Sequence, residues 1–235
     1  MYCVQITLFA PTASFRIPEY HTFQQTLLLP PVTTIRGILG AAAGFDCECV
    51  QKYVKDNNIK VGVIGTSQGR YKDLWKYTKI KDKEAISAVL TRECLYELSF
   101  CIYFVCSNRS VIDDICGWFL NPTYAITAGN SDDLAKVVKV GEIVETEYEE
   151  LDEFENTILP GDHSDNYISN IDIKNAPIMK DLFVPQVYLL PSEFSFNGEE
   201  RRVLKRESYT FVDIPIRLKK PILGVKIEGK AVALL

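Results

Sequence analysis

The sequence predicts an α+β fold, with a ferredoxin-like (RRM-like) domain followed by a small β-rich C-terminal subdomain. Apolar side chains alternate in the first ten residues, as in a strand with one buried face. A Gly- and Ala-rich helical segment follows, and the further segments repeat the order strand, helix, strand, strand, helix, strand. The chain has 235 residues, 47% of them hydrophobic, which is enough for a buried core.

The predicted elements follow from local patterns taken in chain order. Thr33 or Thr34 can cap the first helix, which Gly44 ends. Asn121-Pro122 stops the helix that Ser110 begins. Segments rich in apolar and β-branched residues predict the strands. The remaining predicted elements are a helix at 48–55, strands at 60–65, 95–106 and 124–127, and C-terminal strands at 184–190, 209–216, 225–227 and 231–234.

The negative charge of the chain is concentrated in one segment. The net charge is −5, yet residues 140–173 contain many carboxylates and no Lys or Arg. The remainder is therefore mildly basic, so the net charge does not exclude a nucleic-acid partner. We interpret 141–177 as an acidic linker or loop that faces away from any nucleic acid.

Other function classes find little support in the sequence. Cys47 and Cys49 lack a second Cys or His pair at zinc-site spacing, and no phosphate-binding P-loop occurs. No apolar run approaches the roughly 20 residues that span a bilayer. We therefore expect a cytoplasmic protein with no metal, cofactor, membrane contact or small-molecule substrate.

Three segments indicate a family. They are 13–18, 26–44 with its proline-containing turn before the Gly/Ala-rich helix, and 122–134 with its glycine turn and acidic pair. In this order and spacing they resemble the Cas-five family of CRISPR-associated RAMP proteins. The resemblance covers positions 1 to about 140 well.

The resemblance implies a role and an architecture. Such subunits cap a type I effector complex (Cascade) in antiviral defence, bind the 5′ handle of the guide RNA (crRNA), and contact the backbone and large subunits. It implies a RAMP domain at 1–140 with a projecting β-hairpin thumb at 67–92. The strand pattern separately predicts the β-rich subdomain at 178–235.

A single-stranded handle requires cations for its phosphates and flat side chains for its bases. The thumb segment supplies both kinds, and we predict RNA contacts from Arg70, Tyr71, Lys72, Trp75 and Lys76.

The start of the first helix offers a second contact. Arg36 follows Thr34 and precedes Gly37, in what we predict to be the first turn, where amide groups and the helix dipole favour phosphate. Gly129 is expected to take a positive φ in a tight turn, with amides available to an anion.

Further candidates lie in loops. They are Arg16, Tyr20 and His21 after the first strand, and Arg201 and Arg202, which could contact RNA or a subunit or lie in solvent. Tyr124, in the predicted strand at 124–127, could stack on a base or fill the core.

Two alternatives to a non-catalytic RNA-binding subunit remain open. The first is a metal-free endonuclease of the type I-C kind acting on precursor crRNA, for which Tyr20 and His21 are weak catalytic candidates. The second is a related RAMP subunit of a type III complex.

Overall fold

This computed structural model describes residues 1–20, 23–81, 84–169, 184–198 and 200–235. The predicted α+β class is confirmed: these residues form three α-helices and two largely antiparallel sheets. The helices are α1 (Val32–Ala43), α2 (Cys47–Asp56) and α3 (Arg109–Leu120). No helix in the described ranges is long and apolar enough to cross a membrane.

The larger sheet is built around one long strand. This strand, β5, pairs antiparallel with β1 from Tyr2↔Cys106 to Ala13↔Leu95. The strands lie in the order β11, β12, β9, β3, β5, β1, β6, while β2 and β4 also pair with β5, and β7 pairs with β1. Their bounds are β1 Tyr2–Ala13, β2 Phe23–Gln24, β3 Lys60–Thr66, β4 Gly69–Lys81, β5 Glu84–Cys106, β6 Lys136–Val140, β7 Val144–Glu145, β9 Thr157–Pro160, β11 Gln186–Asn197 and β12 Glu200–Val212.

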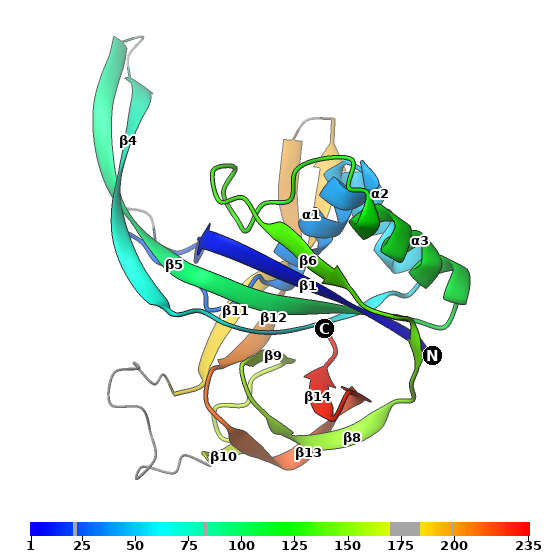
Figure 1. Cartoon of the computed structure of the whole chain (residues 1–235). Coiled ribbons are helices and arrows are strands. Elements are labelled where there is room, and N and C mark those ends of the chain that lie inside the picture. Colours follow the sequence, from blue (N-terminus) through cyan, green and yellow to red (C-terminus); the bar gives the residue numbers. More distant parts are fainter. Residues whose placement is uncertain (21–22, 82–83, 170–183, 199) are drawn as a thin grey trace.

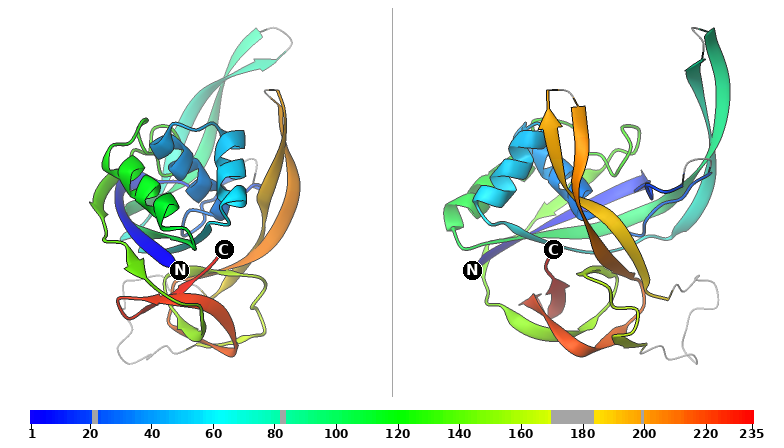
Figure 2. Two further views of the ribbon diagram at one scale, coloured as in Figure 1. Left: turned by 90° about the vertical axis from the view of Figure 1, so that its right-hand side faces the viewer. Right: turned by 180° about the vertical axis from the view of Figure 1, so that it is seen from behind.

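The two faces of this sheet are covered differently. The helices lie on one face and the second sheet on the other, as Figure 2 shows. Because side chains alternate along a strand, Ile102 and Phe104 point into the helix-side core, while Tyr103 and Val105 pack against Val232 of the second sheet. The second sheet contains β8 Glu149–Phe154, β10 Tyr167–Ser169, β13 Ile216–Ile227 and β14 Lys230–Ala233.

One long hairpin projects from the body of the molecule (Figure 1). Strand β4 pairs with the first half of β5 from Gly69↔Tyr96 to Lys81↔Glu84. The predicted strand at 95–106 is therefore only the inner half of β5. The local pattern did not reveal its outer half because the residues there have no buried face to impose an apolar pattern, and only the family resemblance implied a hairpin at 67–92.

The predicted strand at 124–127 is wrong. Only Thr127 makes an isolated bridge, to Leu134, and the strand next to β1 is β6. The amides of Thr123 and Tyr124 donate to the carbonyls of Ala42 and Ala41 at the end of α1, each at 3.0 Å. These bonds hold the segment against the helix instead of the sheet.

The prediction of a loop over the acidic segment is also wrong where the structure describes it. Residues 144–169 contain β7, β8, β9 and β10. Leu151, Phe154 and Leu159 are buried, so apolar residues between the carboxylates provide the inward face of these strands. Residues 170–177 lie outside the described part.

The C-terminal strands do not form one sheet. Strands β11 and β12 extend the larger sheet through β9, whereas β13 and β14 belong to the second sheet. Residues 178–183 are not among those described, and the division of the chain into three parts stays a prediction.

Candidate nucleic-acid interface

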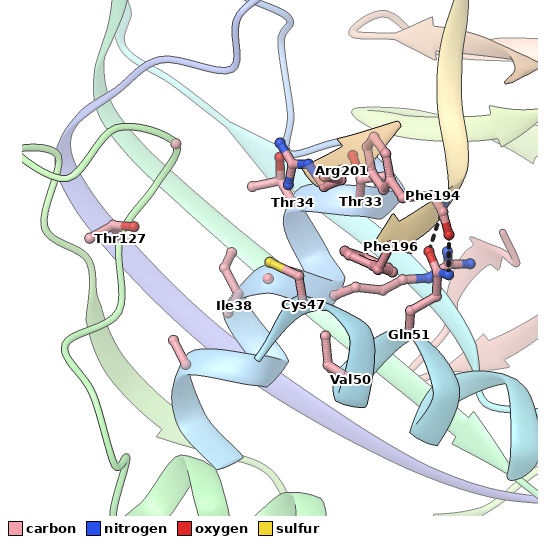
Figure 3. Close-up of a pocket in the computed structure, with 14 residues that line it drawn as sticks. Thr33, Thr34, Ile38, Cys47, Val50, Gln51, Thr127, Phe194, Phe196 and Arg201 are labelled. Carbon is pink, nitrogen blue, oxygen red and sulfur yellow. Dashed lines mark hydrogen bonds between the residues drawn. The ribbon is translucent and has the colours of Figure 1, made fainter. Parts of the chain in front are cut away.

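A cavity of about 400 Å3 lies between α1, α2, the loop at 127–129 and the β11–β12 hairpin (Figure 3). We call it the α1 cavity. It gathers five predicted residues from distant parts of the chain. These are Thr34, Arg36, Gly37, Gly129 and Arg201.

The start of α1 borders this cavity, but neither threonine caps it. The N-cap residue is Pro31, whose carbonyl accepts from the amides of Thr34 at 2.9 Å and Ile35 at 3.0 Å. No side chain caps the helix, and its first turn contains no acidic residue. The positive end of the helix dipole is thus left for an anion.

Arg36 is the fifth residue of α1, which begins at Val32, so its expected place in the first turn is wrong. Its Nη1 donates to the carbonyl of Ser192 in β11. Burial lowers the pKa of the Arg36 guanidinium. Arg36 therefore joins α1 to β11, and a contact of its own with RNA stays a prediction.

The β11–β12 hairpin forms one wall of the α1 cavity. The side chain of Gln51 in α2 donates to the Phe194 carbonyl at 2.8 Å and accepts from the Phe194 amide at 2.9 Å. The Arg201 guanidinium lies 4.6 Å from the centre of the Phe194 ring. The prediction missed Gln51, Phe194 and Phe196. For the two phenylalanines the signal was their alternation just before the Asn197-Gly198 turn.

Arg201 and Arg202 point to opposite faces of this hairpin. Arg201 pairs across the strands with Phe196, and Arg202 with Ser195. Arg202 makes an ion pair with Glu200 at 2.9 Å and does not line the α1 cavity. Only one of the two predicted arginines therefore lies at the candidate interface.

Gly129 takes the predicted positive φ, at 109°. A Cβ there would lie 2.0 Å from the Ser14 carbonyl oxygen, so the turn requires glycine. The amide of Ser14 donates to the Ala128 carbonyl at 3.1 Å, which holds the turn against β1.

The projecting β4–β5 hairpin presents different side chains on its two faces. Strand alternation puts even-numbered and odd-numbered residues of β4 on opposite sides. We define the aromatic face by Tyr71, Trp75, Tyr77 and Lys79, and the aliphatic face by Leu74, Ile80 and Val89 with Lys72 and Lys76. The Trp75 and Tyr77 rings stack with centroids 5.5 Å apart.

Ion pairs hold the base of the β4–β5 hairpin. Arg92, only 7% exposed, donates from Nη2 to Asp73 at 2.8 Å and to Asp132 at 3.0 Å. The hydrogen bond to Asp132 raises the pKa of Arg92. On the other side of the ribbon Arg70 pairs with Glu93 at 3.4 Å. The prediction missed Arg92, because its partner Asp132 lies 40 residues away in the chain.

The other predicted residues do not join the α1 cavity. Arg16 is exposed and bridges to Thr26, and Tyr20, four residues later, is also exposed. His21 lies outside the described residues. Tyr124 is exposed in a separate cleft between α3 and β6. Over the ranges that the structure describes, no three His, Cys, Asp or Glu side chains are placed to hold a metal ion.

The family model described as CRISPR-associated protein (Cas_Cas5) matches residues 3–187, well over half of the chain. The chain belongs to the Cas-five family. Among curated proteins, none matches this member of the family in sequence.

Solved structures share the fold of this Cas-five protein. One is a chain of a CRISPR RNA-guided surveillance complex, with 14% identity, a TM-score of 0.54, and coverage of 92% of this chain and 91% of that one. Another is a CRISPR protein from Archaeoglobus fulgidus, with 13% identity, a TM-score of 0.54, and coverage of 99% and 98%. At such identities the likeness concerns the fold alone.

Proposed function

We propose that this Cas-five protein is a non-catalytic subunit of a CRISPR effector complex that binds the 5′ handle of the crRNA. One observation carries the proposal: the α1 cavity combines Arg201, the uncapped start of α1 and the Gly129 turn, with no Asp or Glu among the described residues that line it. Such a cavity suits a phosphate next to an unstacked base. Phe194 and Phe196 line the described cavity and are partly exposed, so they supply aromatic rings for such a base.

The fold supports the finer parts of this proposal. The order β1, α1, β3, β5, α3, β6, with β1 and β5 paired in the middle, favours the ferredoxin-like RAMP arrangement. We take the β4–β5 hairpin as the thumb, whose aromatic face offers stacking surfaces for bases. The acidic strand β8 lies in the second sheet, across the larger sheet from the helices (Figure 2), where it does not repel RNA at the α1 cavity.

The proposed setting is a type I Cascade in the cytoplasm, with crRNA, a backbone subunit and a large subunit as partners. The type III alternative has the same fold and differs in these partners. Co-expression with the neighbouring genes separates the two, because co-purification with a type I large subunit supports the first and with type III subunits the second.

The RNA-binding test uses two substitutions with the same change of charge. In the co-expressed complex, Arg201→Glu should reduce the crRNA that co-purifies, because it places a carboxylate in the α1 cavity. Arg202→Glu, on the opposite face, should leave it unchanged. The readout is the amount and sequence of the RNA recovered. Equal loss in both variants, or loss in neither, would overturn the role of the cavity.

The endonuclease alternative is tested on the purified chain with a hairpin repeat RNA and EDTA. We expect no cleavage. Specific cleavage that His21→Ala abolishes would replace the non-catalytic proposal with the type I-C one.

A further inference from the structure

A second cleft, of about 530 Å3, lies between the C-terminal end of α3 and the strand β6. We call it the β6 groove. Its lining is mostly apolar, and three large apolar side chains in it are open to solvent: Leu120 is 72% exposed, Tyr124 62% and Val138 56%. Apolar side chains grouped in a cleft, unlike single ones, mark an interaction site.

The strand that borders this groove, β6, is an edge strand of the larger sheet. Strand β6 pairs with β1 on one side only, and no other strand in the described ranges pairs with it. Figure 1 shows β6 beside β1 at the edge of the sheet. Half of its backbone hydrogen-bonding groups are thus available to another chain.

Two features of β6 restrict which chain can pair with it. Lys136 and Lys139 are exposed, and a bulge at Val138 interrupts the register between Thr7↔Lys139 and Leu8↔Val137. Lysines and bulges on an edge strand prevent indiscriminate pairing. They do not account for an open apolar groove next to the edge. No Asp or Glu is among the described residues that line it, so the electrostatics favour a carboxylate-bearing partner.

We propose that the β6 groove binds an extended segment of a partner protein, which adds to the free edge of β6. Its alternate apolar side chains fill the groove against Leu120, Tyr124 and Val138, and a carboxylate between them meets Lys139. A second copy of this chain is a poor occupant, because two β6 edges would bring their lysines together. The predicted RNA contact of Tyr124 is thereby replaced with a protein contact.

The test measures binding of a labelled peptide that alternates valine and glutamate to the full chain by fluorescence anisotropy. Amide hydrogen exchange of residues 136–140 is followed in parallel. We expect slower exchange there, and binding roughly fivefold tighter than for the matching valine–lysine peptide, the scale of an exposed ion pair replaced by like-charge repulsion.

Three variants of the measurement make the outcome decisive. Lys139→Glu should reverse the preference between the two peptides, whereas Lys226→Glu, at an exposed site on β13, should not. A glutamate peptide with N-methylated amides should bind at least about fivefold more weakly, because it cannot complete the strand pairing.

The proposal fails if neither peptide binds or if the N-methylated peptide binds equally well. It also fails if single-stranded RNA, and not the peptide, protects 136–140, or if sedimentation reveals a dimer whose interface protects these residues. None of these outcomes bears on the α1 cavity, so failure here is distinguishable from failure of the proposed function.

Discussion

The two basic hairpins of this protein look alike in sequence and behave differently in space. The β11–β12 hairpin lies against α1 and α2, where Arg36, Gln51 and Lys55 bind it at Ser192, Phe194 and Glu193. The β4–β5 hairpin is held at its base by the ion pairs of Arg92 and Arg70, and its outer part projects from the body (Figure 1). Clustered positive charge therefore does not reveal whether a hairpin forms the wall of a cavity or a free arm.

The difference also changes what each cation can do. In the packed hairpin, contact with the helices selects one face, so Arg201 lines the cavity and Arg202 does not. In the projecting hairpin both faces reach solvent, and they differ in chemistry: the rings of Tyr71, Trp75 and Tyr77 lie on one, and Leu74, Ile80 and Val89 on the other. The predictions below test this contrast, in order of expected effect.

Removing the anchor of the projecting hairpin should cost the most. Arg92→Ala deletes a buried side chain bound to Asp73 and Asp132, and should lower the free energy of unfolding by about 2–3 kcal/mol, less than for a fully buried pair because both carboxylates are partly exposed. Urea unfolding measures this. Lys76→Ala, exposed on the aliphatic face, should change it by less than about 0.5 kcal/mol. Equal effects would mean that Arg92 does not anchor the hairpin.

The aromatic face should matter for RNA and the aliphatic face should not. Trp75→Ala removes one stacking surface and should weaken handle binding by about 1–3 kcal/mol, roughly 5- to 150-fold. Leu74→Ala, the adjacent residue on the opposite face, should leave binding within about twofold. The measurement is a filter-binding titration of the reconstituted complex. Equal losses at both positions would contradict the assignment of faces.

Releasing the packed hairpin should have an intermediate effect on stability. Gln51→Ala leaves the amide and carbonyl of Phe194 without their side-chain partner and should lower the free energy of unfolding by about 1–2 kcal/mol. Thermal and urea unfolding report it. Arg202→Ala, on the solvent side of the same hairpin, provides the control. An unchanged stability in Gln51→Ala would indicate that the wall of the α1 cavity is held by other contacts.

The smallest expected effect is a pH dependence at the base of the projecting hairpin. The hydrogen bond from Arg92 lowers the pKa of Asp132 below its ordinary 3.8. A lowered folded-state pKa stabilises the protein above the ordinary value, and this gain disappears as the pH falls through the folded-state pKa. Because the Asp132 side chain is 58% exposed, the gain should be less than about 1 kcal/mol.

Asp132→Asn should therefore lose less stability than the unsubstituted protein when the pH falls from neutral to below 3.8. Urea unfolding at a series of pH values measures the difference. Asp56→Asn, an exposed position at the end of α2, controls for the loss of one carboxylate. Identical pH profiles in all three proteins would show that the Arg92–Asp132 contact does not contribute in solution.

The sequence by itself determined the family, the approximate helices, the inner strands and the positive φ of Gly129, because each follows from a short local pattern. Only the tertiary structure decided the rest. Arg36 meets Ser192 across 156 residues, the segment at 124–127 is held by α1, and the acidic segment becomes strands when its few apolar residues find a core. These outcomes depend on contacts between distant residues, whose energies no local pattern contains.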